Sequence, residues 1–533
     1  RDRSVSRGLG DVYKRQSLPP YMVPDILKEL DKMPQTPGGK TDLKVLGGIP
    51  VDYICPYHAP ENDVEKAICN AFAAVLNLER AGTDDNFFEN GGDSLSAVEL
   101  VLDIEKELQC GADTGIDYAD IFKYPTPALL AGKIGGRIKE KGSYSISSLD
   151  YAGIDEFLAL NNNEPEDGRE LGNVLLTGAT GYLGIHILIE LLKKPQVGGK
   201  IFCLARPSDR LSALKRMKST LFYYAETDFS ESYGKKWFVI EGDITDLQIF
   251  KEPFMEHIDT VINSAANVSH FVYGNSLACV NVDGVKNLID YALKENAVFC
   301  QVSTISVGGL CGVFDEKKEF TEDSLYIGQE IFNQYIYSKY MAEYVLLRAA
   351  VDRGLAVKIM RVGNLQGRIS DGEFQMNVKT NAFTRQLSSY IKMGAVPESV
   401  YHASVNFAPV DETAHMICVL AGTDANHSVF HVYPTEEIAI SRLFSALDGN
   451  SYKVDVMTDE EFETLLQSLQ QSKEGRKLAE GLLIERPDGR YQEIPAIQER
   501  TGRLLDAFGE KWTPATEEYL SRYLNALAGM DMF

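Results

Sequence analysis

The length, composition and charge of the chain exclude several classes of protein. Its 533 residues suffice for about three domains, and 44% of them are apolar, which is enough for sizeable cores. A formal net charge of −24 argues against a nucleic acid or an anionic membrane as a partner. The sequence contains neither a run of about 18 apolar residues nor a signal-peptide pattern, so it predicts a cytoplasmic protein without a membrane span.

The cysteines and histidines predict no metal site. None of the eight cysteines belongs to a Cys-x-x-Cys pair, and they lie in apolar contexts typical of reduced, buried thiols. Among the eight histidines, only His427 and His431 are close in sequence. No further cluster of Cys, His or acidic residues completes a set of ligands around these two, so we interpret both as structural.

The first fifty residues contain two different patterns. Residues 1–16 are polar and basic without an apolar period, and we interpret them as an artefact of sequence assembly. Residues 17–50 are rich in proline and contain Thr36–Asp42, which reads TPGGKTD. This part resembles the tail of an adenylation domain of peptide synthetases, in which the motif lysine contacts the acyl-adenylate. Lys40 matches that lysine, Gly38 departs from the usual asparagine, and we expect Lys40 to be idle because the rest of such a domain is missing.

Residues 58–135 show the pattern of a small bundle of four helices. Apolar residues recur at helical spacing from Glu61 to Leu78 and again from Ser94 to Leu108. Phe122 and the stretch from Pro125 to Leu130 predict a short third segment and a final helix.

Ser94 stands at the expected start of the second of these helices. The stretch from Asp85 to Leu95 reads DNFFENGGDSL. A serine at a helix N-terminus after two glycines is accessible, and the helix start favours a phosphate there. With its flanking helices, the motif resembles the attachment site of peptidyl carrier domains. The resemblance implies a covalent 4′-phosphopantetheine arm on Ser94 that holds a thioester; the alternative is that Ser94 merely caps the helix.

Residues 136–170 predict a linker between folded parts. They are rich in Gly, Ser, Asn, Glu and Asp, and only one short helix is expected, near Ile154 to Leu160. A flexible joint is what a shuttling carrier domain needs.

From residue 171 onward the pattern alternates between strands and helices. Short apolar runs predict six strands, at 173–177, 200–205, 237–241, 260–263, 299–303 and 356–361. This alternation predicts an α/β fold with a doubly wound parallel sheet, which we expect to span 171–435. Residues 436–533 are more helical and polar, and we expect them to form a substrate-binding cap.

A glycine pattern follows the first predicted strand. Gly178, Gly181 and Gly184 precede and open a helical run. Glycine at these places permits a tight turn, close approach of the backbone to a pyrophosphate, and close packing of helix on strand. The sequence therefore predicts a Rossmann-type dinucleotide site, to which other residues of the turn also contribute, namely Thr180, Tyr182 and Leu183.

The residues after the second and third strands indicate which dinucleotide binds. Arg206 stands where an acidic residue would bond the ribose of NAD, and arginine instead pairs with a 2′-phosphate. Arg210 lies in the same basic cluster, in which Asp209 is the only acid from residue 200 to 218, so NADPH is favoured. Asp243-Ile244 resembles the adenine-contacting pair of extended short-chain dehydrogenases, although Asp243 could also be a plain loop residue.

Tyr335 and Lys339 are four residues apart and therefore share one helix face. The stretch from Asn333 to Glu343 reads NQYIYSKYMAE and resembles the active-site helix of that dehydrogenase superfamily. The resemblance implies that Tyr335 donates a proton and that Lys339 holds the nicotinamide ribose. The ammonium of Lys339, together with the positive charge that develops on the nicotinamide, should lower the tyrosine pKa. It also implies a substrate-binding hydroxyl at the end of the fifth strand, where we favour Thr304 over Ser303. A packed aromatic helix without catalysis is the alternative.

Two further motifs, Arg361–Asn364 and Asn406–Asp411, extend the likeness. Residues 171–533 resemble the thioester reductase domains of nonribosomal peptide synthetases. Together with the carrier domain and the adenylation tail, they imply the C-terminal fragment of such a synthetase. The implied activity is reductive release: NADPH reduces the thioester on Ser94 to an aldehyde or onward to an alcohol, while hydroxyl groups stabilise the oxyanion. The implied partners are upstream synthetase domains, a phosphopantetheinyl transferase and the acyl or peptidyl thioester.

Three other functions share parts of this pattern. Carboxylic acid and α-aminoadipate reductases have the same domain order. Release domains that cyclise their substrate without redox chemistry tend to lose the catalytic tyrosine, which is present here as Tyr335. Nucleotide-sensing modules of the same fold tend to lose the tyrosine–lysine pair and carry no carrier domain.

Overall fold

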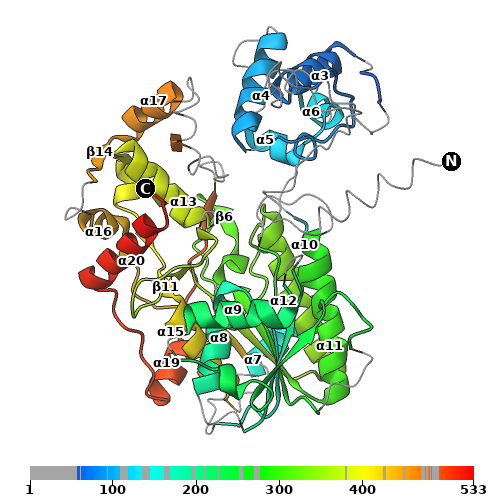
Figure 1. The fold of residues 1–533 in the computed structure, drawn as a ribbon, viewed down its shortest axis with the longest axis vertical. Coiled ribbons are helices and arrows are strands. Elements are labelled where there is room, and N and C mark those ends of the chain that lie inside the picture. The colour runs from blue at the N-terminus through cyan, green and yellow to red at the C-terminus, as the bar shows by residue number, and fades with distance from the viewer. Residues whose placement is uncertain are drawn as a thin grey trace, which may run out of the picture. The chain divides into compact units, whose positions relative to one another are not determined.

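The computed structural model divides the chain into two compact units (Figure 1). The first comprises residues 1–142 and 472–485, and the second comprises residues 143–471 and 486–533. The structure describes residues 57–60, 62–92, 94–108, 118–134, 144–160, 168–193, 198–208, 211–225, 227–250, 256–268, 276–378, 381–423, 428–447, 452–469, 475, 478–479, 482 and 491–533. The predictions for residues 1–50, Arg210 and His427 lie outside these described residues.

Four helices build the described part of the first unit, coloured blue to cyan in Figure 1. They are α3 (Asp63–Val75), α4 (Ser94–Glu107), α5 (Tyr118–Lys123) and α6 (Pro127–Ile134). Asn62 begins α3, because its side chain accepts a hydrogen bond from the Glu65 N–H at 2.9 Å. The apolar faces meet in one core, where the rings of Phe72 and Phe87 pack edge to face with centroids 5.3 Å apart. The helices that the sequence predicts are therefore present.

A seven-stranded parallel sheet forms the centre of the second unit, in the order β12-β7-β5-β4-β1-β2-β3. Its strands are β1 (Val174–Thr177), β2 (Ile201–Ala205), β3 (Trp237–Glu241), β4 (Thr260–Asn263), β5 (Val298–Thr304), β7 (Val357–Val362) and β12 (Ser428–Val432). Chain order runs outward in both directions from β1, so the sheet is doubly wound as predicted. The sequence does not single out β12, an edge strand with a histidine among its apolar residues.

Helices cover both faces of this sheet, and alternate strand residues enter two different cores. One core joins Leu176, Cys203 and Ile262 to helices α8 (Tyr182–Lys193), α9 (Ala213–Tyr224) and α15 (Val410–Ala421). The other joins Leu175, Phe202 and Val261 to α11 (Gly284–Glu295) and α12 (Gln334–Arg353). Burial on both faces explains why the strands read as continuous apolar runs. No described helix is both long and apolar enough to cross a membrane.

The C-terminal part is built from segments on both sides of residue 435. β10 (Ser404–Val405) pairs with β13 (Ile438–Ala439), and β9 (Ala395–Pro397) pairs with β14 (Asp455–Met457). The cap predicted for 436–533 therefore also draws on earlier residues, and its boundary stays a prediction. Its helices are α13 (Ala382–Met393), α14 (Glu398–Tyr401), α16 (Ile440–Ser445), α17 (Asp459–Leu469), α19 (Arg500–Ala507) and α20 (Glu517–Gly529). Two further strand pairs are β8 (Leu365–Gln366) with β11 (Ala408–Pro409) and β6 (Leu310–Gly312) with β15 (Tyr491–Glu493).

Residues 144–160 differ from the flexible linker that composition predicts for 136–170. The expected short helix is present as α7 (Ile154–Leu160). However, Ile146, Ile154 and Leu158 are each at most 2% exposed and belong to the core beside α12. A few apolar anchors in a polar segment are enough to fix it on a large folded unit, and composition averages them away.

Candidate active site and cofactor turn

Ser94 is the first residue of α4, as the carrier motif predicts. The N–H of Gly92 donates to the Phe87 carbonyl at 2.9 Å and closes the turn before the helix. A Cβ on Gly92 would lie 2.4 Å from the Phe87 ring, and Gly91 has a φ of +92°. Both glycines are therefore required by the turn. Asp93 and the side chain of Ser94 lie outside the described residues.

Three glycines form the turn between β1 and α8. Gly178 has a φ of +71°, and a Cβ there would lie 2.5 Å from the backbone nitrogen of Ala265. A Cβ on Gly184 would lie 2.1 Å from the Gly178 carbonyl oxygen, so α8 approaches the turn closely only without a side chain. Gly181 is exposed, and its Cβ would meet only the Gly178 oxygen, at 3.1 Å. Two glycines thus serve packing, while Gly181 leaves the backbone at the start of α8 open to a pyrophosphate.

The other predicted residues of the turn have different surroundings. Thr180 is half-buried. Leu183, in the first turn of α8, points into the core between this helix and the sheet. The Tyr182 hydroxyl donates to the Gln366 carbonyl at 3.0 Å, and burial raises the pKa of this phenol well above its usual value. The Tyr182 ring packs against three others, those of His186, Tyr224 and Phe374. Tyr182 and Leu183 therefore have their backbone groups, rather than their side chains, available for a cofactor.

Arg206 follows β2 directly, and 64% of its side chain is exposed. Its Nη1 lies 3.3 Å from Oδ2 of Asp243. Arg216 of α9 donates to the Arg206 carbonyl at 3.3 Å, and burial together with the charge of Arg206 lowers the Arg216 pKa. Among the described residues, Asp243 is thus the one carboxylate paired with these two neighbouring guanidinium groups, an arrangement that an added phosphate would stabilise. The sequence prediction does not include Arg216 among the site residues, although the basic cluster contains it.

Asp243 and Ile244 follow β3 and lie in different environments. Partial burial acts to raise the pKa of Asp243, but hydrogen bonds from Thr245 and the charge of Arg206 outweigh it and lower that pKa. Ile244 is 5% exposed and packs against Gly284 of α11. Asp243 is therefore an ionised, accessible acceptor beside Arg206, whereas Ile244 belongs to the wall beneath it. Their contact with an adenine stays a prediction.

The predicted catalytic pair lies in the first turns of α12. Asn333 begins the helix, because its Oδ1 accepts from the N–H of Tyr335 at 2.9 Å. Lys339 is 5% exposed, and its Nζ donates to the Val302 carbonyl at 2.8 Å. Val302 lies two residues before the end of β5, and α12 also packs on the following turn η4 (Ile305–Gly308). Tyr335 and Lys339 on α12 therefore lie near the carboxyl end of the sheet, where Rossmann-type folds bind their ligands.

Burial shifts the pKa values of the pair in opposite directions. It raises the pKa of Tyr335 to about 12. It lowers the pKa of Lys339 to about 8, against the charge of Glu343, which acts to raise it. In the protein by itself, loss of hydration therefore dominates, and the lowering expected from Lys339 together with a bound nicotinamide stays a prediction. A phenol with this pKa keeps its proton at neutral pH and can donate it, which is the direction that a reduction requires.

The end of β5 separates the two candidate hydroxyl groups. Ser303 is 2% exposed and donates to Oε1 of Glu343 at 2.5 Å. Thr304 is half-buried, and its Oγ1 accepts from the Ser306 N–H at 3.2 Å. Successive strand residues point to opposite sides. Because Ser303 is engaged with a buried carboxylate, the geometry supports Thr304 as the substrate-binding hydroxyl, and that role stays a prediction.

A fully buried ion pair joins α12 to the sheet. Glu343 and Arg361 of β7 are both unexposed, with Oε2 and Nη2 2.8 Å apart. Arg361 also lies over the Phe320 ring and 3.2 Å from Nε2 of His431. His431 in turn faces the Ile497 carbonyl, and burial holds its pKa well below the usual range. These contacts agree with a structural role for His431. In the described part of the chain, no group of three or more His, Cys, Asp or Glu residues could hold a metal ion.

Asn281 supports the site, although the sequence prediction does not include it. It is 2% exposed and lies in a π-helical turn, η3 (Cys279–Asp283). Its Nδ2 donates to Oγ of Ser338 at 2.8 Å, and its side chain makes two hydrogen bonds to the backbone of Asn267. Ser338 donates to the Tyr335 carbonyl at 2.7 Å. Asn281 therefore ties the first turn of α12 to the segment after β4.

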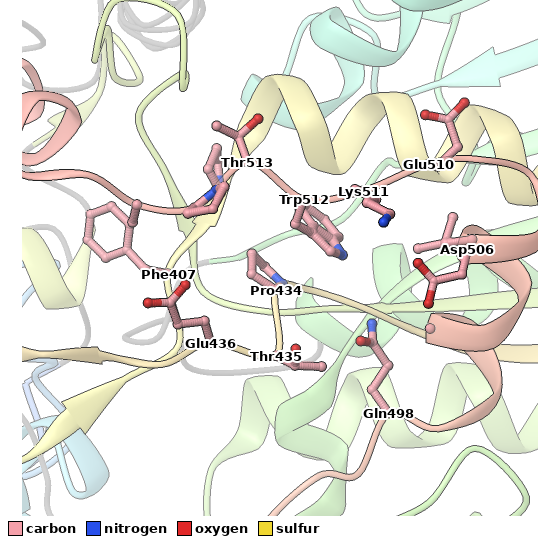
Figure 2. A pocket seen from close by; sticks show the side chains of 15 residues that line it. Phe407, Pro434, Thr435, Glu436, Gln498, Asp506, Glu510, Lys511, Trp512 and Thr513 are labelled. Atoms are coloured by element: carbon pink, nitrogen blue, oxygen red, sulfur yellow. The ribbon is translucent and has the colours of Figure 1, made fainter.

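A cavity of about 280 Å³ lies among residues from β11, the loop after β12, and the segment from α19 onward (Figure 2). Pro434, Gln498 and Trp512 are part of its lining. The Trp512 Nε1 group is buried and has no hydrogen-bond partner among the residues that the structure describes. None of the predicted site residues that the structure describes lines this cavity, so we assign it no part in the chemistry.

Comparisons with known proteins identify the family. The family model "Phosphopantetheine attachment site" matches residues 66–134, and "Male sterility protein", an NAD-binding family, matches residues 176–417. A solved thiolation-reductase di-domain from an archaeal nonribosomal peptide synthetase is 37% identical, with a TM-score of 0.78 over 90% of this chain and 99% of that one. The chain belongs to the thiolation-reductase family of nonribosomal peptide synthetases. In this family context, the predicted fold class and both cofactor classes, a phosphopantetheine arm and a nicotinamide dinucleotide, are confirmed.

Curated relatives of this thiolation-reductase protein are much longer. Isonitrile lipopeptide synthase from Mycobacterium tuberculosis is 31% identical over an alignment of 457 residues, and the match covers 78% of this chain and 18% of that protein. L-2-aminoadipate reductase from Saccharomyces cerevisiae is 26% identical over an alignment of 456 residues, and the match covers 76% of this chain and 32% of the relative. The chain thus spans less than a third of the length of each of these two relatives.

Proposed function

We propose that the protein releases an acyl or peptidyl thioester from the arm on Ser94 by NADPH-dependent reduction to an aldehyde. The observation that carries the proposal is the combination in one chain of a carrier helix that begins at Ser94 and a nicotinamide fold whose α12 presents Tyr335 and Lys339. The likeness to a solved thiolation-reductase di-domain supports it.

The protein groups divide the work of this reaction. The turn at Gly178–Gly184 binds the pyrophosphate, and Arg206 with Arg216 holds the 2′-phosphate. NADPH, when bound, supplies the hydride. Tyr335 and Thr304 hold the thioester oxygen, and Tyr335 donates the proton. One hydride and one proton convert the thioester to a hemithioacetal, whose carbon–sulfur bond then breaks to give the aldehyde and the free thiol of the arm.

Residues around the pair prepare it for this role. The phenol of the half-buried Tyr335 retains its proton, since loss of hydration raises its pKa to about 12. Lys339 already donates one hydrogen bond to the Val302 carbonyl, which fixes its ammonium group at the end of β5. An ammonium has three N–H donors, so two remain that could bond to the nicotinamide ribose and to the Tyr335 hydroxyl.

A loaded-protein assay tests the proposal. The chain is converted to its phosphopantetheine form with a broad transferase and an acyl-coenzyme A, and NADPH absorbance is followed in a single turnover. We expect one NADPH oxidised per acyl group and an aldehyde in the mass spectrum. Ser94→Ala should abolish this turnover yet still reduce a free acyl-pantetheine thioester, because only the attachment point is lost. A released acid or cyclised product without NADPH oxidation would contradict the proposal.

A second candidate is reduction of a single amino acid, as the name of the yeast relative indicates for that protein. Its domain order is the same, so the acyl group alone distinguishes the two. Comparing α-aminoadipyl-pantetheine with a dipeptidyl-pantetheine in the free-thioester assay separates them. A preference for the first of about tenfold or more would favour the aminoadipate function. The presence of both Tyr335 and Lys339 argues against a non-redox cyclising or sensing role.

The proposed partners follow from the same chemistry. A carrier domain requires upstream synthetase domains to deliver its acyl group and a phosphopantetheinyl transferase to attach its arm. We also propose a cytoplasmic location. The six described cysteines form no disulfide, which agrees with a reducing compartment.

A further inference from the structure

The segment that precedes the reductase core packs along the predicted catalytic helix. We call residues 144–160 the strap. The N–H of Tyr144 donates to the Ile331 carbonyl at 2.7 Å, just before α12 begins. The Tyr144 ring stacks on that of Tyr337, with centroids 4.3 Å apart and planes at 14°. Tyr337 lies midway in sequence between the two predicted catalytic residues, so the strap contacts the catalytic turn itself.

A second anchor of the strap lies one turn further along. The Tyr151 hydroxyl donates to the Ile146 carbonyl at 2.8 Å and lies 2.7 Å from the hydroxyl of Tyr340. Tyr151 has only one hydroxyl hydrogen, so the fully buried Tyr340 must be the donor between them. The Tyr151 ring also stacks on Tyr326 at 4.8 Å. Tyr340 directly follows Lys339, and the strap thus holds the helix next to the lysine.

The strap continues to contact α12 beyond the catalytic turns. The Tyr344 hydroxyl donates to the Asp150 carbonyl at 3.2 Å, and Nη1 of Arg348 donates to the Ala152 carbonyl at 2.7 Å. Ile154 and Leu158 of helix α7 are then buried in the same core. The strap therefore accompanies α12 from its N-terminus to its fourth turn.

These contacts form a stripe of their own on α12. Its members are spaced three or four residues apart, as one helix face requires: Tyr337, Tyr340, Tyr344 and Arg348. A second stripe, Tyr335, Lys339 and Glu343, is spaced by four and holds the catalytic pair and the buried ion pair with β7. The helix is thus held between the sheet on one side and the strap on the other.

We propose that the strap is a positioning element of the active site, in addition to connecting the carrier to the reductase. It fixes the rotation and depth of α12 and thereby the places of the Tyr335 hydroxyl and the Lys339 ammonium. A helix held on the sheet side alone could shift slightly, and a misplacement of about 1 Å can cost up to 10²-fold in rate. The inference rests on the proposed reductase function.

The test uses the full chain with a free acyl-pantetheine thioester, which needs no tether. Tyr151→Phe removes the hydroxyl that links Tyr340 to the strap and keeps the ring stacked on Tyr326. Tyr144→Ala removes the stack on Tyr337. We expect kcat to fall on the order of tenfold in each, with NADPH affinity and KM for the thioester nearly unchanged. Tyr223→Phe is the matched control, since it removes a tyrosine hydroxyl bond to Glu373 outside the strap and should leave kcat unchanged.

The outcomes separate the strap from the proposed function. If the unaltered protein does not oxidise NADPH with the thioester, the reductase proposal fails whatever the variants do. If the unaltered protein is active and both strap variants match it, the strap is only a tether and the inference is overturned. A loss of rate accompanied by an equal loss of NADPH affinity and a large fall in Tm would mean general destabilisation, which also overturns it.

Discussion

The glycine turn after β1 and helix α12 both position reacting groups, but they do so by opposite means. The turn depends on the absence of side chains, since a Cβ on Gly178 or Gly184 would lie 2.5 Å or less from backbone atoms. Helix α12 depends on added contacts instead. Hydrogen bonds and an ion pair hold it to two strands, to a π-helical turn and to the strap. Steric positioning is local and abrupt, whereas positioning by hydrogen bonds is distributed and graded. Variants in the two regions should therefore fail in different ways.

The largest effect on turnover is expected from Tyr335→Phe. This change removes the proton donor and keeps the ring, so NADPH affinity and Tm should stay close to those of the unaltered protein. General acid catalysis contributes about 10²- to 10⁴-fold, and the single-turnover rate with acyl-pantetheine should fall by that factor. Lys339→Ala should lose rate and NADPH affinity together. Near-normal rates in Tyr335→Phe would contradict the assignment of the proton donor.

Gly184→Ala should act on the turn through volume alone. Its Cβ would lie 2.1 Å from the Gly178 oxygen, and such overpacking costs about 1–3 kcal/mol. If the cost falls on the NADPH-bound state, affinity drops by roughly 5- to 150-fold. Gly181→Ala is the control, because its Cβ would meet the same oxygen only at 3.1 Å. Thermal melting should show a clearly lower Tm for Gly184→Ala and little change in Tm for Gly181→Ala. Equal decreases in Tm would contradict the assignment of Gly184 to helix packing and of Gly181 to an open backbone.

Arg206→Ala should remove most of a preference for NADPH over NADH. A charge-assisted hydrogen bond is worth about 1.5–3 kcal/mol, or roughly ten- to a hundredfold in binding. Arg216→Ala should have an effect in the same direction, since the two guanidinium groups are neighbours. Titrating both dinucleotides by fluorescence measures the ratio. NADH affinity should be nearly unchanged in either variant, and a parallel loss for both dinucleotides would show that the arginines do not read the phosphate.

Thr304→Ala should have a smaller effect than Tyr335→Phe. It removes one hydrogen bond to the oxyanion while the tyrosine contact remains, and a neutral bond is worth about 0.5–1.5 kcal/mol, or roughly two- to tenfold. The same hydroxyl caps η4 at the Ser306 N–H, so Tm should also fall slightly. Thr304→Ser keeps the hydroxyl and should restore both rate and Tm. Ser303→Ala should instead lower stability, because it leaves the buried Glu343 with one donor fewer.

The smallest of these effects is expected in the pH dependence of the rate, which should follow the titration of Lys339. Burial lowers its pKa to about 8, so the ammonium is lost as pH rises through that value, and the rate should fall about fourfold from pH 7 to 8.5. The unfolded chain holds this proton up to the ordinary lysine pKa near 10.5. Stability should therefore rise with pH between about 8 and 10.5, because the unfolded state binds more protons there. Denaturation of Lys339→Met across this range should lose that rise; an unchanged slope would mean that other groups cause it.

The features that could be predicted from the amino-acid sequence are those whose residues lie close together along the chain. The spacing of Gly178, Gly181 and Gly184 between a strand and a helix is contiguous, and so is that of Tyr335 and Lys339 on one helix. Strands of the buried parallel sheet are continuous apolar runs in the sequence, so six of the seven could be predicted. The position of Ser94 at a helix start followed from two glycines and two amphipathic stretches.

The contacts of these residues could not be predicted from the sequence, because their partners come from elements that are distant along the chain. The sequence favours Thr304 over Ser303 only by resemblance, whereas the structure shows what each hydroxyl contacts: Ser303 donates to the buried Glu343, forty residues later, and Thr304 donates to Ser306 beside it. The linker reads as flexible by composition, yet Tyr151 meets Tyr340 across 189 residues. Even the sign of the Tyr335 pKa shift required the fold, since burial depends on what packs around a side chain rather than on its neighbours in the chain.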